Sequence, residues 1–127
     1  MLPQAAYNAF KSRLTNNCRN ANLVGVCNVG SKGLFNGYCF KMTAVQLAAF
    51  PPLTIVMPGA TITIPPQQYI VDGYCGQAGY LALALDPINA NMIIMGDTVH
   101  RQYEVIYDRI NSRMGFAAAS NCPAPSS

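Results

Sequence analysis

Residues 93–117 read IIMGDTVHRQYEVIYDRINSRMGFA and carry the clearest structural pattern in the chain. An apolar run over 92–95 predicts a buried strand, which ends at the following glycine. Asp97 comes next, at a position where an aspartate caps a short helical turn. Apolar and polar side chains alternate over 103–107, and 113–117 returns after a turn, so these two runs predict an antiparallel hairpin.

Upstream of this stretch, the pattern predicts one long helix followed by several strands. Apolar residues recur at three- and four-residue spacings from Ala6 to Leu14, and the helix is expected to end near Asn17. Two alternating five-residue runs flank Pro58-Gly59, which predicts a hairpin. The remaining expected elements are a short helix over 44–49, capped by Thr43, and strands over 69–71 and 79–85. The fold class is mostly β with one long helix.

The composition excludes several classes of protein. Charged residues make up 10% of the 127 residues and the net charge is +3, whereas an ordinary soluble domain has about 25% charged residues. The chain is therefore not a disordered tail, and its scattered basic residues predict no nucleic-acid partner. Its apolar runs are shorter than the roughly 18 residues of a membrane span. So apolar a chain is expected to bury part of its surface against another lobe, a partner or a missing segment.

Five cysteines predict disulfides in an oxidising compartment rather than a metal site. There is no CxxC pair and His100 is the single histidine, so no metal or other cofactor is expected. The odd number of cysteines leaves one that is free, pairs between chains or has lost its partner. The amino terminus does not have the pattern of a signal peptide, which is expected to lie outside this sequence.

Residue by residue, the chain offers no complete active site. Three of its aspartates, Asp72, Asp86 and Asp108, lie at predicted turns, where aspartate is common for local hydrogen bonding. Asp97 follows an apolar run and is expected to point inward in a structural role. His100 is expected at the surface, and neither a G-x-S-x-G elbow nor a phosphate-binding glycine loop occurs.

The stretch 93–117 resembles the closing segment of pepsin-like aspartic proteases. That family ends with an apolar pair, Gly-Asp, a short helix, a strand similar to Y-x-V-x-[YF]-D-R, and R-x-G-F-A. Upstream, residues 50–55 (FPPLTI) and 65–70 (PPQQYI) are similar to two further elements of the family. Leu2-Pro3, followed by a helix, resembles the segment just after the second catalytic loop. The resemblance thus covers nearly the whole chain.

The resemblance implies a partial lobe of the pepsin-like acid protease β-barrel fold, mostly β with one or two helices. Residues 1–122 are expected to be a C-terminal lobe without its first strands and catalytic loop, and residues 123–127 a frayed tail. Each lobe of the family contributes one aspartate on a D-[TS]-G-[TS] loop, which here is expected upstream of Met1. No D-[TS]-G occurs in the sequence, and Asp97-Thr98-Val99 does not have the glycine.

The resemblance also assigns roles to individual residues. Ile94, Met95 and Gly96 are expected to form the strand beside the catalytic loop, with Ile94 facing the substrate cleft. Asp97 is expected behind that strand, as a structural support rather than a catalytic group. The loop over 86–91 is expected near the cleft edge.

For the cysteines, the resemblance implies a disulfide between Cys39 and Cys75. Cys18 and Cys27, nine residues apart in one loop, are expected to pair with each other. Cys122 is then the unpaired cysteine, because its partner in some family members lies upstream of the catalytic loop.

The resemblance implies an aspartic-type endopeptidase that activates water between two aspartates, of which this chain alone is an inactive piece. Its partner would be a peptide or protein substrate, bound through the missing N-terminal lobe, and exposed sheet edges suggest a homodimer. The expected location is the secretory pathway, extracellular or vacuolar/lysosomal. The alternatives are a non-catalytic binding or inhibitory module made from the same lobe, and an unrelated secreted β-sandwich, against which the motifs argue.

Overall fold

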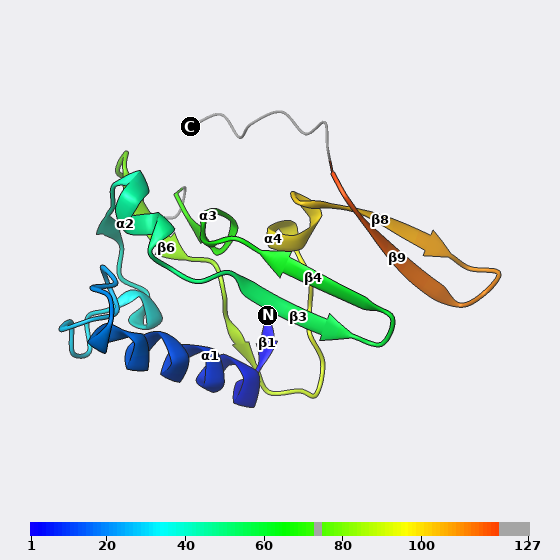
Figure 1. Cartoon of the computed structure of the whole chain (residues 1–127), viewed down its shortest axis with the longest axis horizontal. Coiled ribbons are helices and arrows are strands. Elements are labelled where there is room, and N and C mark those ends of the chain that lie inside the picture. The colour runs from blue at the N-terminus through cyan, green and yellow to red at the C-terminus, as the bar shows by residue number, and fades with distance from the viewer. Residues whose placement is uncertain (73–74, 120–127) are drawn as a thin grey trace.

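The computed structural model describes residues 1–72 and 75–119, with Asp97 described by its backbone alone. Its longest helix, α1 (Gln4–Asn16), begins directly after Pro3 and ends where the sequence predicts (Figure 1). Tyr7, Phe10 and Leu14 are its buried residues. Their spacing of three and four residues places them on one face of the helix, which packs on the core.

Strands β3 (Leu53–Met57) and β4 (Ala60–Ile64) form the predicted hairpin. The two-residue turn uses Gly59, whose φ of +79° is a left-handed conformation that glycine adopts without strain. Ile55, Ile62 and Ile64 are buried on one face of the hairpin, and the threonines alternate with them on the exposed face. The alternation in the sequence thus defines which face meets the core.

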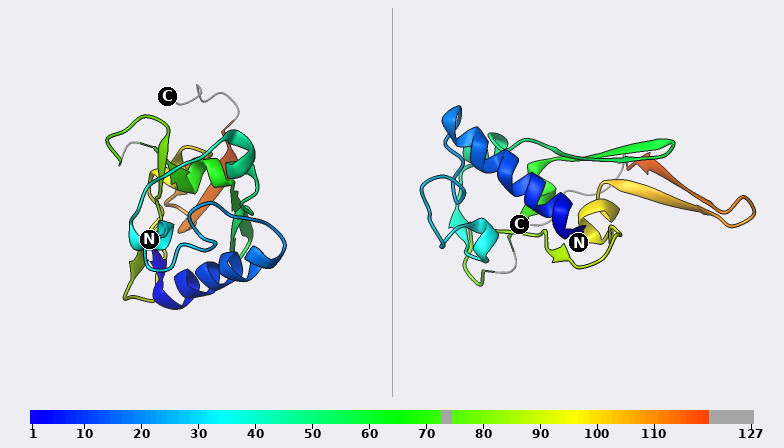
Figure 2. Two further views of the ribbon diagram at one scale, coloured as in Figure 1. Left: turned by 90° about the vertical axis from the view of Figure 1, so that its left-hand side faces the viewer. Right: turned by 90° about the horizontal axis from the view of Figure 1, so that it is seen from below.

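Strands β8 (Tyr103–Asp108) and β9 (Arg113–Ala118) form a second hairpin, as predicted, with six residue pairs in register. Figures 1 and 2 show this hairpin extending away from the body of the molecule. Its base is attached to β4, because the Tyr103 hydroxyl accepts a hydrogen bond from Thr63 N at 2.9 Å and donates one to Thr63 O at 3.2 Å.

The remaining elements are short and form small sheets. In the described residues, the sheets are β2-β6-β5, the parallel pair β1-β7, and the two hairpins. None of the described helices is long and apolar enough to cross a membrane. The short elements are β1 (Leu2–Pro3), η1 (Asn17–Arg19), η2 (Leu34–Asn36), β2 (Phe40–Lys41), α2 (Ala44–Ala48), α3 (Pro66–Tyr69), β5 (Ile70–Val71), β6 (Tyr80–Leu83), β7 (Pro87–Ile88) and α4 (Asp97–His100). The fold is therefore mostly β with a few helices, the class that the sequence predicts.

The core joins α1 to the β3-β4 hairpin and to α3. Tyr69 lies at its centre: its ring meets the ring of Phe10 edge-to-face at 5.5 Å, and its hydroxyl donates to Pro51 O at 2.6 Å. Burial raises the pKa of Tyr69 well above its ordinary value. The buried core residues are Leu2, Tyr7, Phe10, Leu14, Leu23, Leu34, Phe50, Ile55, Ile62, Ile64, Tyr69, Ile70, Leu85 and Val99.

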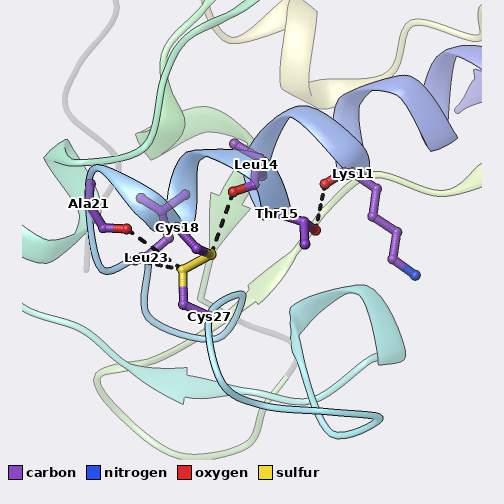
Figure 3. Close-up of a disulfide and its surroundings, with 7 residues drawn as sticks. All are labelled: Lys11, Leu14, Thr15, Cys18, Ala21, Leu23 and Cys27. Carbon is purple, nitrogen blue, oxygen red and sulfur yellow. Dashed lines mark hydrogen bonds between the residues drawn. A yellow bond between two sulfur atoms is a disulfide. The ribbon is translucent and has the colours of Figure 1, made fainter.

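Two disulfides close the loops around this core. Cys18 and Cys27 are joined at the end of α1, where Leu23 N donates to Cys27 Sγ at 3.3 Å (Figure 3). Cys39 and Cys75 are joined across 36 residues of sequence. Both expected pairings are therefore present. Cys122 and the expected tail over 123–127 lie outside the described residues.

Candidate functional site

The first residue of the chain lies beside Ile94. The amino group of Met1 donates to Ile94 O at 2.8 Å, and Ile94 N donates to Met1 O at 3.0 Å. Two bonds exchanged by one residue pair are the pattern of antiparallel strands. On the other side, Leu2 N donates to Asp86 O at 2.9 Å, and β1 runs parallel to β7. The start of the chain, which precedes α1, thus lies between β7 and the stretch around Ile94.

The apolar stretch over 92–95 is not a buried strand, and that prediction is wrong. It adopts no regular structure, and Ile94 is 45% exposed. Met92 and Ile93 are exposed as well, because the described elements leave these side chains uncovered although the backbone of Ile94 is bonded to Met1. An apolar run in the sequence alone does not distinguish a segment that is buried on both faces from one whose apolar side chains stay exposed.

A groove of about 470 Å³ opens beside Ile94. Three features form its walls: the tip of the β3-β4 hairpin, the stretch over 93–95, and one face of the β8-β9 hairpin. Tyr103 and Phe116, on that face of the hairpin, meet edge-to-face at 6.5 Å. The lining residues are Met57, Pro58, Ala60, Ile93, Ile94, Met95, His100, Val105, Tyr107, Met114 and Phe116. The groove therefore offers a mainly apolar surface with one imidazole and one phenol.

A second, smaller hollow of about 30 Å³ lies behind Ile94. Met95, Gly96 and Val99 are among its lining residues, together with Met1 and Leu2 from the start of the chain. At Gly96, an added Cβ would meet no atom within 4 Å, so the space over this glycine is open. Backbone at a glycine can be approached closely by another chain or by a ligand.

The described carboxylates lie outside the groove. Asp108 accepts hydrogen bonds from Asn111 Nδ2 at 2.9 Å and from Arg113 Nε at 2.8 Å, at the β8-β9 turn. These bonds hold the pKa of Asp108 below its ordinary value, the one from Asn111 having the largest effect. Asp72, Asp86 and Glu104 are exposed. Among the described side chains, no hydrogen bond joins two carboxyl groups.

The groove can bind apolar side chains but contains no described carboxylate to activate a water molecule. The described residues also contain no group of three or more His, Cys, Asp or Glu side chains that could hold a metal ion. His100 is exposed, as the sequence predicts, and it also lines the groove.

The structure brings together some of the residues singled out in the sequence. Ile94 and Met95 line the groove, and Gly96 lies in the hollow behind it. The loop over 86–91 contributes no residue to the lining of either space, and β7 within it pairs with β1. Asp97 begins α4, and its predicted role concerns a side chain outside the described part of the structure.

Sequence reasoning did not identify the two hairpins as walls of the groove. The signal was present, because apolar residues alternate along both hairpins while the chain has too few elements to cover both faces. Long-range contacts, such as the one between Tyr103 and Thr63, determine which of the uncovered hairpin faces lie opposite one another.

Comparison with known proteins adds independent information. A family model described as "Xylanase inhibitor C-terminal" matches residues 1–118. Cathepsin E from Aquarana catesbeiana is 29% identical over 99 residues, which are 76% of this chain and 23% of that protein. Human gastricsin is 33% identical over 84 residues, covering 64% of this chain and 21% of that protein. Cyprosin from Cynara cardunculus is 30% identical over 80 residues, covering 59% and 17%. The chain spans about a fifth of the length of these relatives.

Proposed function

The chain belongs to the xylanase inhibitor C-terminal family, and on that premise we propose that it is part of the C-terminal lobe of an aspartic-type endopeptidase. Its similarity to cathepsin E and gastricsin supports this proposal. The observation that carries it is the apolar groove with Ile94 and Met95 in its wall. In this role the groove receives apolar side chains of a peptide substrate.

Hydrolysis by this class of enzyme needs two aspartates that share a proton. One accepts a proton from the attacking water while the other donates one to the amide. No D-[TS]-G sequence occurs in the 127 residues. We propose that polypeptide outside these residues supplies both catalytic aspartates. The present chain then shapes the substrate cleft through Ile94, Met95 and Gly96, with Asp97 as a support behind them, and does not cleave peptides by itself.

The two disulfides fit a location in an oxidising compartment. We therefore propose that the protein passes through the secretory pathway to an extracellular or vacuolar/lysosomal destination. The formation of both bonds in the secreted protein, mapped by mass spectrometry, tests this proposal.

A peptide-cleavage assay at acidic pH tests the inactivity of the chain alone. We expect that the chain alone shows no peptide cleavage that is sensitive to a general aspartic-protease inhibitor. Turnover sensitive to that inhibitor would contradict the proposal, because it would require a carboxylate pair within these residues.

Binding of an apolar peptide tests the groove separately from hydrolysis. We expect Ile94→Asp to weaken binding about tenfold or more, because it places a charge in an apolar wall. Val45→Asp is the matched control, since Val45 is 81% exposed on α2 and does not line the groove. Equal binding by the two variants would exclude the groove as the peptide site.

The second candidate is a non-catalytic binding or inhibitory module. The description of the matching family, a xylanase inhibitor, specifically favours it. If the chain acts in this way, adding it to a xylanase lowers xylan hydrolysis in a saturable manner. A saturable effect on xylanase, with no binding of apolar peptides to the groove, would favour this candidate over the protease lobe.

A further inference from the structure

A second apolar trench, of about 510 Å³, lies between α1 and β3, and it shares the lining residue Ile93 with the candidate groove. Leu2, Phe10 and Ile55 form its buried floor. Exposed residues, Ala6 and Ala9 on α1 and Val56 on β3, form its rims. Residues of both elements line the trench, and α1 lies below β3 in the view of Figure 1.

The trench continues into a polar hollow of about 300 Å³ near the end of α1. Arg13 and Pro51 line both spaces, so the two are joined at these residues. The other lining residues are three asparagines, Asn16, Asn17 and Asn20. Among the described residues that line the two spaces, Arg13 is the one with a charged side chain.

The Arg13 guanidinium makes no ion pair with the described residues, in which the single salt bridge joins Arg113 to Asp108. An exposed guanidinium surrounded by amide side chains is suited to bind a carboxylate, because its N–H groups can donate two parallel hydrogen bonds. The apolar trench thus ends at a site for negative charge.

Within the described part of the chain, β3 pairs with β4 alone, so the edge of β3 that faces away from β4 has backbone groups that no described strand pairs with. Tyr103 bonds both N and O of Thr63, so those groups on β4 point away from β3. Thr63 is paired in register with Thr54, and both members of a non-hydrogen-bonded pair point outward. The N–H and C=O groups of Thr54, and by alternation those of Val56, therefore face outward from the hairpin. Both residues line the trench.

An unpaired strand edge is a template for another strand. Pro51 and Pro52, at the start of β3, have no N–H group, so pairing ends beside Arg13. A strand added antiparallel to β3 has its carboxyl end at this point. A strand added in parallel would place its amino end there, next to a cation.

We propose that this trench binds the extended C-terminal segment of a partner polypeptide, which adds antiparallel to the edge of β3. Its apolar side chains enter the trench over Phe10 and Ile55, and its terminal carboxylate is held by Arg13. Residues 52–56 define the length of the site, which corresponds to about five residues or about 17 Å of extended chain.

The test uses the full chain and a fluorescein-labelled peptide, Val-Thr-Val-Thr-Val, with a free carboxylate. Fluorescence anisotropy compares it with the same peptide carrying a terminal amide. We expect the free acid to bind about tenfold tighter, because a hydrogen-bonded charge pair is lost with the amide. Added salt reduces this difference. Equal affinity of the two peptides would overturn the proposal.

Two pairs of variants locate the bound peptide. Arg13→Gln should remove the preference for the free acid, while Lys11→Gln, an exposed cation on the same helix outside both spaces, should leave it intact. Ala9→Trp fills the trench and should abolish binding, whereas Ala5→Trp, exposed on α1 but outside the lining, should not.

An unchanged preference in Arg13→Gln, or unchanged binding in Ala9→Trp, would overturn the proposal. Circular dichroism confirms that each variant is folded. A different outcome would also overturn the proposal. If the chain forms a dimer that the Arg13 and Ala9 variants disrupt and that the peptide does not displace, a second copy of the chain occupies the trench.

Discussion

Tyr103 and Thr63, forty residues apart in the sequence, are joined by two hydrogen bonds through a single phenolic oxygen. The bonds fasten the base of the β8-β9 hairpin to the outward edge of β4. They therefore maintain the spacing of two walls of the candidate groove, Met57 and Pro58 on one side and Val105 on the other.

Removing this hydroxyl should loosen the hairpin. We expect Tyr103→Phe to lower the free energy of unfolding by about 1 kcal/mol, because two backbone groups lose a partner. Amide hydrogen exchange should become faster in β8 and β9 than in α1. Tyr107→Phe is the control, since no hydrogen bond of its hydroxyl to the described residues is present. Equal effects of the two variants would mean that the Tyr103 bonds do not hold the hairpin.

The two disulfides should contribute unequally to stability. Cys39–Cys75 closes a loop of 36 residues and Cys18–Cys27 one of nine. The loop-entropy model predicts that the longer loop stabilises the fold by about 1 kcal/mol more. Urea unfolding of the two paired Cys→Ser variants, each in a Cys122→Ser background, measures the difference. If removal of the Cys18–Cys27 disulfide lowers the free energy of unfolding more, local packing rather than chain entropy determines the contribution of the disulfides.

Tyr69 should make the fold sensitive to alkaline pH. Burial raises its pKa in the folded state, so the neutral phenol is stabilised below the ordinary tyrosine value of about 10. This contribution to stability is lost as the pH rises from the pKa of tyrosine in the unfolded state toward the raised pKa of the folded state. In that range the unfolded state releases the proton more readily than the folded state does. In Tyr69→Phe the decline in stability above pH 10 should be smaller. Absorbance of tyrosinate at high pH should show that Tyr69 ionises together with unfolding.

The β8-β9 hairpin should promote self-association. Ile106 and Ile110 are exposed on it, at 52% and 95%, and the hairpin has free outer edges in the described sheets. We expect the sedimentation coefficient to rise with concentration, and Ile106→Lys to shift this rise to at least tenfold higher concentration. Val45→Lys, at an exposed position on α2 outside both the groove and the trench, serves as the comparison. A concentration-independent coefficient would exclude a homodimer through these edges.

The sequence predicted the elements that local chemistry specifies. The β3-β4 hairpin follows from Pro58-Gly59 between two alternating runs, and α1 from the spacing of Tyr7, Phe10 and Leu14. Thr43 caps α2 as expected, since its hydroxyl accepts a hydrogen bond from Gln46 N at 3.2 Å. Each of these features depends on residues close together in the chain.

Long-range features were not predictable in the same way. The pairing of β1 with β7 joins residues more than eighty positions apart, and nothing in either short segment specifies the other. The run over 92–95 was expected to be buried because it is apolar, yet burial depends on whether another element covers it. The groove depends on the relative placement of two hairpins, and so sequence reasoning found Ile94 and Met95 but not the opposite wall.

The antiparallel bonds between Met1 and Ile94 determine the path of anything joined to the amino terminus. An amide nitrogen can donate to Ile94 O as the terminal ammonium does, so an added residue preserves the bond. In this register, added residues travel past Met95 and over the open face of Gly96. An affinity tag attached at this end would therefore be directed over the hollow that Met95, Gly96 and Val99 line, and would obstruct it.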